Sequence, residues 1–515
     1  MNIVELFRAG ATNHPDWHAI IDARGVTTFA AMDAASSAIA GQLQRAGLRA
    51  GDTVLVLYPM SAELYVTLGA IFRLGLVAMF LDPSVGRDHL ESCCTLHPPQ
   101  ALIASPKAHL LRLISPQMRR IPRKFVLGGF VPGATSLSLF GDADIAIAKM
   151  EADSPALITF TSGSTGQPKA ALRTHGFLIA QYQALRTSLN LTAGDCDLST
   201  LPVFVLANLA AGVTSVIPKA DLRFPGAIAP APVVAQIQRH RLLSTAASPA
   251  LLERIADYCL LHQFQLTSLQ KIFTGGAPVF PPLLDKLQAI APHARIVAVY
   301  GSTEAEPIAK IAWDEITDDD RKAMRNSGGL LAGKPVPEIQ LRLLPDQWGT
   351  PIAPFTQAEF DALCLLTNEP GEIVVRGDHV LPGYLHGRGN EETKFQVDGQ
   401  LWHRTGDAGY VDALGRLWLL GRCAAKIRDA RGMLYPFTVE CAASHDPDVK
   451  RAAVVQQNEQ RVLVIEWREP QPSLKELKAD LRWAGIDEVR TLKAIPVDKR
   501  HNAKVDYPAL SKLLG

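Results

Sequence analysis

Short runs of β-forming residues alternate with helical patterns along this chain, and that alternation limits the folds it can adopt. Thr53–Tyr58 (TVLVLY) has the composition of a strand, Ser61–Leu74 that of a helix, and Leu76–Leu81 (LVAMFL) that of another strand. Further strand signals stand at Ala101–Ala104, Ala156–Phe160, Ile296–Tyr300 and Glu372–Arg376. This order predicts an α/β fold with mixed or parallel sheets sandwiched between helices.

Two helices are indicated by proline at their first turn, where the missing N–H costs nothing. They are predicted over Pro249–Cys259 and Pro281–Ile290. The apolar stretches Leu68–Leu81 and Val203–Pro218 are shorter than the roughly 20 residues of a membrane span, so we expect them to be core.

The length of 515 residues exceeds one compact domain, and the character of the chain changes near Gly421–Arg422. Before that point a turn-rich passage (TGDAGYVDALGRLWLLGR) predicts a β-hairpin-rich subdomain. After it, strand and helix signals at Ala452–Gln456, Val462–Trp467 and Leu474–Trp483 predict a small, mobile α+β domain. The predicted domains are therefore 1–420 and 421–515, with a hinge at 420–423.

Charge and cysteine usage exclude several classes of protein. Lys and Arg total 52 against 51 for Asp and Glu, so the whole chain has no attraction for nucleic acid or an anionic membrane. The 7 cysteines are odd in number and form no CxxC pair, which fits neither a disulfide framework nor a zinc site. A cytoplasmic protein with reduced thiols is the interpretation that these counts favour.

Residues Ile158–Lys169 (ITFTSGSTGQPK) combine an apolar strand with a loop suited to phosphate. Small residues let backbone N–H groups approach an anion, hydroxyls donate further hydrogen bonds, and a lysine supplies charge. The loop is neither a Walker A motif nor a GxGxxG fingerprint. A flexible surface loop rich in Ser and Gly is the plain alternative. The residues expected to bind phosphate are Thr161, Ser162, Gly163, Ser164, Thr165, Gly166 and Lys169.

Four more motifs follow the loop in a recognisable order. They are Val299–Pro307 (VYGSTEAEP), Arg404–Tyr410 (RTGDAGY), Leu420–Arg422 (LGR) and Pro496–Tyr507 (PVDKRHNAKVDY). Together with the loop, they resemble the adenylate-forming superfamily of acyl-CoA synthetases, luciferases and peptide-synthetase adenylation domains. The resemblance extends over essentially the whole chain.

That resemblance implies an enzyme that joins ATP to a carboxylic acid, and it assigns roles by position. The phosphate loop would hold the β- and γ-phosphates, and the ring of Tyr300 would stack on adenine. Thr303 would contact the α-phosphate, Glu304 would help to hold Mg²⁺, and Lys504 would bridge the substrate carboxylate and the α-phosphate. The remaining implied nucleotide-site residues are Gly275, Gly276, Ala277 and Pro278 along the adenine, Gly301, Asp407 at the ribose hydroxyls, and Arg422 at the hinge.

Each assignment has a structural alternative when the residue is considered singly. Tyr300 could be a core aromatic, Asp407 a turn residue and Lys504 a surface lysine. A structural or solvated role is the better interpretation of His501. Lys426 and Arg428 could be catalytic or could belong to a charged surface turn.

The acid is expected to be apolar. An α-amino acid would need a carboxylate to hold its ammonium, and the region that lines the acyl pocket in this superfamily, Leu201–Pro218, contains no acid. Phe204, Asn208 and Gly212 are the candidate lining residues, with core packing as the alternative.

The group that accepts the acyl chain is left open, because the sequence after Arg422 differs from the pattern of CoA-ligating relatives. Where CoA-ligating relatives have two acids, this chain has Ala424 and Ala425, while Arg431 stands at the expected glycine and Gly432 follows one place late. These features are similar to the β-lactone synthetases of olefin biosynthesis, which favours intramolecular capture by a β-hydroxyl. A fatty-acyl-CoA ligase with CoA as co-substrate is the alternative, and a non-catalytic nucleotide-binding protein is a second one. The oligomeric state cannot be predicted from the residues.

Overall fold

The computed structural model describes residues 1–81, 86–141, 144–162, 168–468, 474–497 and 504–515. The chain forms two compact units, and each contains segments that are distant in the sequence. Unit 1 comprises Met1–Ala220, Gln236–Ala246 and Asp378–Asn390; unit 2 comprises Asp221–Ala235, Ala247–Gly377 and Glu391–Gly515. The chain passes between the units after Ala220, within α9 (Pro230–His240), at the end of β12 (Ser244–Ala247), after Gly377, and at the start of α14 (Asn390–Thr393).

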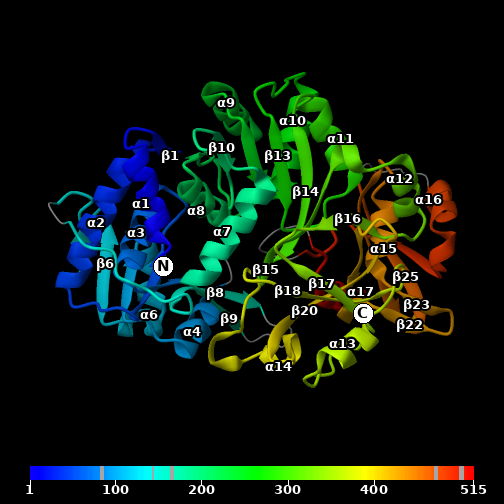
Figure 1. Cartoon of the computed structure of the whole chain (residues 1–515). Helices are drawn as coiled ribbons and strands as arrows, with labels where there is room; N and C mark the ends of the chain where they lie inside the picture. Colours follow the sequence, from blue (N-terminus) through cyan, green and yellow to red (C-terminus); the bar gives the residue numbers. More distant parts are fainter. Residues whose placement is uncertain (82–85, 142–143, 163–167, 469–473, 498–503) are drawn as a thin grey trace. The chain divides into compact units, whose positions relative to one another are not determined.

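Unit 1 contains a largely parallel sheet in the order β7-β6-β5-β3-β4-β8-β9 (Figure 1). Its strands are β3 (Thr53–Leu57), β4 (Val77–Phe80), β5 (Ala101–Ala104), β6 (Arg123–Leu127), β7 (Thr135–Leu137), β8 (Pro155–Ser162) and β9 (Pro168–Thr174). All neighbouring pairs are parallel except the β8–β9 hairpin. A parallel sheet is covered by helices on both faces, as the alternating pattern predicted.

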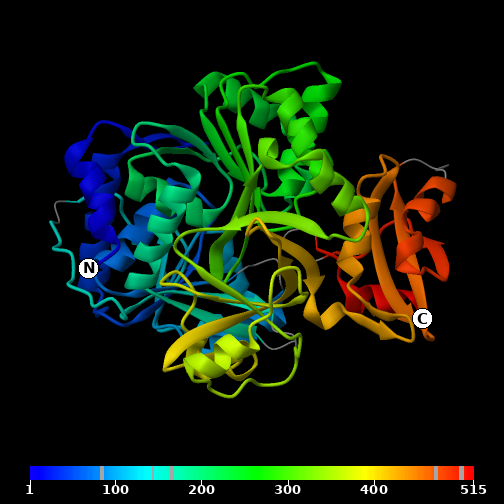
Figure 2. The ribbon, with the colours of Figure 1, turned by 45° about the vertical axis from the view of Figure 1, so that its right-hand side comes forward.

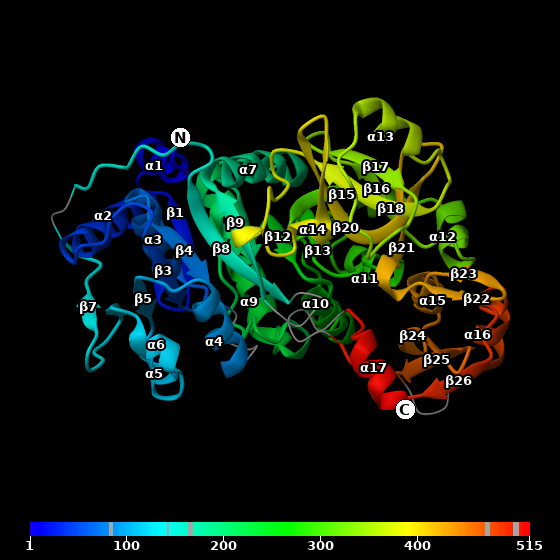
Figure 3. The same cartoon turned by 90° about the horizontal axis from the view of Figure 1, so that it is seen from below.

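The strand β3 shows why its sequence is apolar throughout. Val54 and Val56 join the core cluster that contains Ile39 of α2 (Phe29–Arg45) and Ile71 of α3 (Ala62–Arg73). Leu55 and Leu57 point the other way, into a cluster with Leu90 of α4 (Arg87–Leu96) and Met118 of α6 (Pro116–Arg120). Figure 3 shows these two pairs of helices on opposite faces of the strands. Because side chains alternate along a strand, burial on both faces requires a continuous apolar run.

The remaining elements of unit 1 form a second group of strands, in the order β2-β1-β11-β10-β12. Thr174 caps the N-terminus of α7 by accepting from the N–H of Phe177 at 3.1 Å. Pro202 begins α8, and Gly212 ends it in the left-handed conformation with φ +73°. The strands and helices of this part of unit 1, together with α5, are β1 (His18–Asp22), β2 (Gly25–Thr28), β10 (Cys196–Ser199), β11 (Thr214–Val216), α1 (Val4–Asn13), α5 (Leu111–Ile114), α7 (His175–Leu189) and α8 (Pro202–Ala211).

Unit 2 carries a mostly antiparallel run of strands in the order β13-β14-β15-β16-β21-β20-β18-β17, with β19 paired to β20. These are β13 (Lys271–Gly275), β14 (Arg295–Ser302), β15 (Ala305–Ala312), β16 (Leu330–Pro335), β17 (Gln340–Leu344), β18 (Gly371–Arg376), β19 (Lys394–Val397), β20 (Gln400–Val411) and β21 (Leu417–Arg422). The turn-rich passage therefore forms the β20–β21 hairpin, as predicted. The helices of this part are α10 (Pro249–Leu261), α11 (Pro281–Ile290), α12 (Asp318–Arg325) and α13 (Gln357–Leu363), and the first two begin at the predicted prolines.

The residues after Arg422 build an α+β arrangement with cores of their own (Figure 2). Alternate residues of β24 (Val449–Gln457) and β25 (Gln460–Trp467) pack against α15 (Pro436–Ala443) and α16 (Leu474–Asp480) on one face and α17 (Tyr507–Leu514) on the other. The other strands are β22 (Ile427–Asp429), β23 (Gly432–Leu434) and β26 (Glu488–Thr491). The α+β expectation is confirmed, whereas the boundary at 420–423 stays a prediction. Among the described residues, no helix is long and apolar enough to cross a membrane.

A buried ion pair joins β18 and β20 in unit 2. Arg404 and Glu372 are each about 1% exposed, and the guanidinium donates to both carboxylate oxygens at 2.8 and 2.6 Å. The third guanidinium nitrogen donates to the carbonyl of Thr350 at 2.6 Å. Arg404 opens the RTGDAGY motif, so its role is to hold the strand that carries Asp407.

We predict that Arg404→Met lowers the free energy of unfolding by about 3–5 kcal/mol, because Glu372 would stay buried without its partner. Denaturant unfolding monitored by tryptophan fluorescence measures this change. The double variant Arg404→Met/Glu372→Met is the control, and it should lose markedly less stability. Equal midpoints for wild type and the single variant would contradict the assignment.

Candidate active site

A cavity of about 330 Å³ in unit 2 collects many of the predicted nucleotide-site residues. Its wall is formed by the loop after β13, the end of β14, the ends of β20 and β21, and the segment before α17. The predicted site residues that line it are Gly276, Ala277, Pro278, Tyr300, Gly301, Asp407, Arg422 and Lys504. These come from positions more than 200 residues apart in the sequence, so the fold brings the four motifs of this unit together.

The carboxylate of Asp407 is fixed by two neighbours. Tyr300 donates its hydroxyl to one oxygen at 2.7 Å, and Arg422, paired with Asp407 across the β20–β21 hairpin, donates to the other at 3.0 Å. Burial and then the Asp407 charge raise the pKa of Tyr300 well above its usual value, while the same charge raises the pKa of Arg422. A carboxylate has about four acceptor sites, so Asp407 can still accept from two further hydroxyls.

Gly275 and Gly276 both have reasons to be glycine, the first a close approach of its backbone to β14 and the second a left-handed conformation. A Cβ on Gly275 would lie 2.5 Å from the carbonyl oxygen of Val299, and Gly276 has a φ of +80°. Both positions therefore require glycine. The result is a strip of bare backbone along the cavity wall, which suits the edge of a flat heterocycle.

Thr303 and Glu304 form the tip of the β14–β15 hairpin, and the N–H of Glu304 donates to the hydroxyl of Ser302 at 3.2 Å. The charge of Glu304 acts on Lys394, a buried lysine that sequence reasoning missed. Burial lowers the pKa of Lys394 to about 7, although the Glu304 charge opposes that shift. The only sequence signal is that this lysine begins a short strand, β19 (KFQV), beside the apolar Phe395.

The donor set at Glu304 fits Mg²⁺ better than a soft metal. The described part of the chain holds no cluster of three or more His, Cys, Asp and Glu side chains. Mg²⁺ characteristically takes one or two carboxylates and completes its shell with substrate phosphates and water. A single carboxylate at a hairpin tip is compatible with that arrangement.

Lys504 lies on the cavity wall just before a short antiparallel bridge between Val505 and Val497. Its side chain is exposed to solvent. Two other residues on this wall, Glu440 and Tyr507, were not predicted, and they hydrogen-bond to each other. His501 lies outside the described residues.

The phosphate loop of unit 1 connects β8 and β9, whose register pairs Thr161 with Lys169 and Ser162 with Pro168. It is therefore a hairpin loop at the end of a sheet strand. The Lys169 ammonium lies 5.8 Å from the centre of the Tyr384 ring, and its aliphatic chain lies against Gly389. Gly163, Ser164, Thr165 and Gly166 lie outside the described residues.

The three predicted acyl-pocket residues lie at or beside α8. Phe204 is buried, and Gly212 has the left-handed conformation that ends the helix. The amide of Asn208 donates to Asp197, Ser199 and Ser215 at 3.0–3.1 Å, inside a buried polar cluster. Both carboxylate oxygens of Asp197 accept hydroxyl donors, from Ser199 at 2.6 Å and Ser244 at 2.7 Å. Lining of an acyl pocket stays a prediction for all three.

The segment after Arg422 is held by ion pairs that its sequence did not reveal. Lys426 pairs with Asp346 at 2.6 Å, and the hydroxyl of Tyr435 donates to the same carboxylate at 2.8 Å. These contacts support the structural interpretation of Lys426. Gly432, with φ +102°, is the first residue of β23 and directly follows Ala430 and Arg431, which form the turn of the β22–β23 hairpin.

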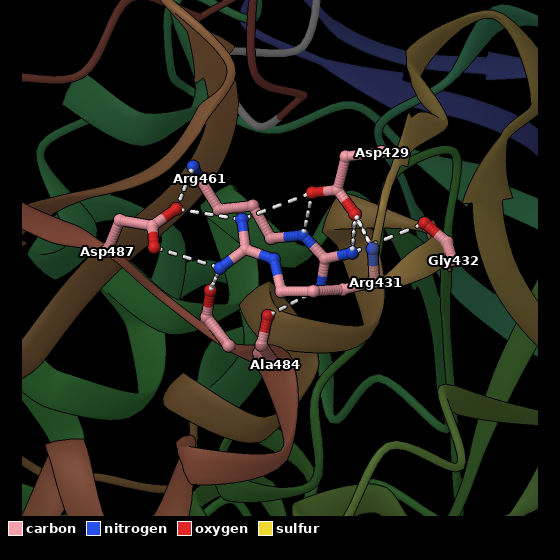
Figure 4. Close-up of polar contacts among 7 residues, drawn as sticks. Asp429, Arg431, Gly432, Arg461, Ala484 and Asp487 are labelled. Carbon is pink, nitrogen blue, oxygen red and sulfur yellow. Dashed lines mark hydrogen bonds and ion pairs between the residues drawn. The ribbon is translucent and has the colours of Figure 1, made fainter.

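Figure 4 shows how Arg431 and Arg461 fasten that hairpin. Arg431 donates to both oxygens of Asp487 at 2.8 Å and also contacts Asp429. Arg461 donates to both oxygens of Asp429 at 2.7 Å. Donation from Arg461, then from Arg431, holds the pKa of Asp429 at about 2. The arginine at the expected glycine position therefore ties the hairpin to the segment before β26.

Comparison with known proteins identifies the family. Residues 7–385 match the family described as AMP-binding enzyme. An olefin β-lactone synthetase from Stenotrophomonas maltophilia is 31% identical over 504 residues, covering 93% of this chain and 90% of its own. An indoleacetate–CoA ligase from Aromatoleum aromaticum is 29% identical over 442 residues, covering 82% and 79%.

The fold has solved counterparts as well. The O-succinylbenzoate coenzyme A synthetase of Bacillus subtilis, in complex with ATP and magnesium ion, superposes with a TM-score of 0.76 at 22% identity, covering 97% of this chain and 98% of its own. The resemblance read from the motifs is confirmed, and the alternative of a non-catalytic nucleotide-binding protein falls away. The chain belongs to the AMP-binding enzyme family and is an AMP-forming ligase that activates a small-molecule carboxylic acid.

Proposed function

We propose that this enzyme activates a fatty-type β-hydroxy acid as its acyl adenylate and then closes it to a β-lactone. The observation that carries the proposal is the cavity on whose wall Lys504 lies with Tyr300, Asp407 and Arg422. A relative named as an olefin β-lactone synthetase matches 93% of the chain, which supports the second step.

In the first step a carboxylate oxygen of the acid attacks the α-phosphorus of ATP, and the bond to the leaving pyrophosphate breaks. Two anions must approach each other, so cationic groups and donors have to offset their repulsion. Lys504 orients the carboxylate and stabilises the charge that develops on the α-phosphate, with Thr303 donating to the same group. No side-chain nucleophile is needed.

The nucleotide is positioned by the residues already described. The ring of Tyr300 and the backbone of Gly275–Pro278 flank the adenine, and Asp407 accepts from the ribose hydroxyls. The hairpin loop of unit 1, Thr161–Lys169, binds the β- and γ-phosphates. Glu304 would help to hold Mg²⁺, which would supply positive charge to offset that of the phosphates.

An apolar acid is supported by the surroundings of α8. The sequence Leu201–Pro218 contains no carboxylate, and the neighbouring Asp197 is buried with hydroxyl donors on both oxygens. An ammonium group placed there would lack an available counter-ion, and burying it unpaired is costly. A long acyl chain carries no such cost. We assign Phe204, Asn208 and Gly212 to this pocket as candidates.

In the second step the β-hydroxyl oxygen attacks the acyl carbon, the bond to AMP breaks, and the hydroxyl proton is released. The reaction is intramolecular, so effective molarity offsets part of the ring strain. The segment after Arg422 supports this route. Ala424 and Ala425 stand where CoA-ligating relatives have acids, and Arg431, in the β22–β23 hairpin, is paired with Asp487. The indoleacetate–CoA ligase relative keeps thioester formation as the second candidate.

The residues 421–515 are proposed to act as a small domain that delivers Lys504. Their two separate hydrophobic cores support this division. The hinge would then lie at 420–423, directly after the strand that carries Arg422.

We predict that Lys504→Ala lowers the rate of adenylation by about 10²–10³-fold and leaves ATP affinity within about twofold, because its ammonium acts on charge that develops only in the transition state. Pyrophosphate release measures the rate, and calorimetry measures ATP binding. Lys512→Ala, an exposed lysine on α17, is the matched control and should behave as wild type. Weak ATP binding with normal turnover of the bound complex would show that Lys504 is a binding residue instead.

We also predict that a long-chain β-hydroxy acid with ATP and Mg²⁺ yields a β-lactone without CoA. Mass spectrometry of the products, with and without CoA, tests this, and the same acid lacking the β-hydroxyl is the control. The lactone should form at nearly the same rate in both conditions. Stoichiometric acyl-CoA from simple fatty acids, with no lactone from their β-hydroxy analogues, would decide for the CoA ligase.

A further inference from the structure

The cavity wall contains a half-buried carboxyl, that of Glu440, which neither the motifs nor the proposed chemistry uses. Glu440 lies on α15 and accepts the hydroxyl of Tyr507, the first residue of α17. Both side chains line the same cavity as Lys504, and Tyr507 follows Lys504 by three positions. This hydrogen bond therefore joins α15 to the start of α17, close in the sequence to Lys504.

Val505 and Tyr507, which follow Lys504 in the chain, pack against the hydrophobic core that β24, β25 and α17 share. The backbone of this segment is held by the Val505–Val497 bridge and by the bond from the N–H of Asp506 to the carbonyl of Pro496, at 2.9 Å. These tie the segment to its own hairpin. The Glu440–Tyr507 bond is the contact that ties it to α15, whose Phe437 packs against Phe280 with ring centres 5.9 Å apart.

We propose that Glu440 and Tyr507 are positioning residues that hold Lys504 at the α-phosphate during adenylation. This inference rests on the proposed role of Lys504. Neither side chain needs to touch the substrate, since the bond acts by fixing the start of α17. Without this hydrogen bond, the Lys504 ammonium would still reach the cavity but would occupy a wider range of positions. Adenylation requires the ammonium to be held in a narrow range of positions.

The environment of Glu440 makes the arrangement sensitive to pH. The titratable groups around it are Tyr507 of α17, Lys450 and Arg451 of β24, Lys504, and Cys441 of α15. Elsewhere on the wall, Arg468 and Glu253 pair with each other at 3.2 Å. Desolvation raises the pKa of Glu440 to about 7, although donation from Tyr507 and the charge of Arg451 oppose the shift.

The direction of the pH effect follows from that shift. Above pH 7 Glu440 is mostly ionised and accepts a charge-assisted hydrogen bond, which is roughly twice as strong as a neutral one. Below pH 7 the carboxyl becomes neutral and the bond weakens. Positioning of Lys504 should therefore improve as the pH rises through about 7.

The test compares pyrophosphate release between pH 5.5 and 9 in wild type, Glu440→Gln and Tyr507→Phe, with Glu488→Gln as the control. Glu488 pairs with Arg490 on β26 and does not line the cavity. We expect kcat of the wild type and the control to rise through pH 7. Glu440→Gln should lose that rise, because an amide oxygen accepts from Tyr507 at every pH. Tyr507→Phe should lose it too, with kcat lowered about 10-fold or more and KM for ATP little changed.

A second readout does not depend on catalysis. Amide hydrogen exchange of Tyr507–Leu514 should be faster in Tyr507→Phe than in wild type and unchanged in Glu488→Gln. If wild type releases no pyrophosphate with any acid, the proposed function fails, yet the exchange result still tests the contact. A pH rise retained in Glu440→Gln, or unchanged exchange in Tyr507→Phe, would overturn the positioning role. Either variant alone suffices if the other does not fold.

Discussion

The carboxylate of Asp407 ties three strands of unit 2 together at the wall of the cavity, and the rest of the nucleotide site depends on it. It accepts from Tyr300 at the end of β14 and from Arg422 at the end of β21, while its own strand β20 is anchored by the buried Arg404–Glu372 pair. These contacts fix the aromatic ring, the predicted hinge arginine and the predicted acceptor for ribose in one arrangement. Such preorganisation lowers the cost of binding and of reaction.

The choice of acceptor depends on a different set of charges. Arg431 and Arg461 bind Asp487 and Asp429 and make the β22–β23 hairpin part of the final α+β arrangement. Lys426 and Tyr435 meanwhile bind Asp346, on the other side of the predicted hinge. The acids expected of a thioester-forming loop are thus replaced by Ala424 and Ala425, and the nearby Lys426 and Arg431 are paired with Asp346 and Asp487. An intramolecular hydroxyl does not need that loop, because it arrives with the acyl group.

Much of the fold could be predicted because its strands are buried on both faces. Thr53–Leu57 is apolar throughout for that reason, and β18, β20 and β21 also lie where their sequences placed them. Tyr300, Asp407 and Lys504 were predicted from motifs, and the fold brings them to one wall of the cavity. Their assigned roles stay predictions, as do those of the loop residues Gly163–Gly166.

Contacts between distant polar residues could not be predicted. Glu440 and Tyr507 are separated by 67 positions, and neither pattern nor composition indicates that they meet. Asn208 was selected because it lies in an apolar stretch, but its amide hydrogen-bonds to Asp197, a residue outside that stretch. Arg431 was recognised as an anomaly, although its partner Asp487 was not. Pairwise hydrogen bonding depends on the tertiary fold, which local sequence does not encode.

The central claim is that a carboxylate oxygen of the substrate attacks the α-phosphorus of ATP. An acid labelled with ¹⁸O in both carboxyl oxygens tests it most directly, since that oxygen must leave with AMP. Mass spectrometry should find one ¹⁸O in each AMP, none in pyrophosphate, and one in the lactone carbonyl. Unlabelled AMP, or label in pyrophosphate or phosphate, would contradict the account.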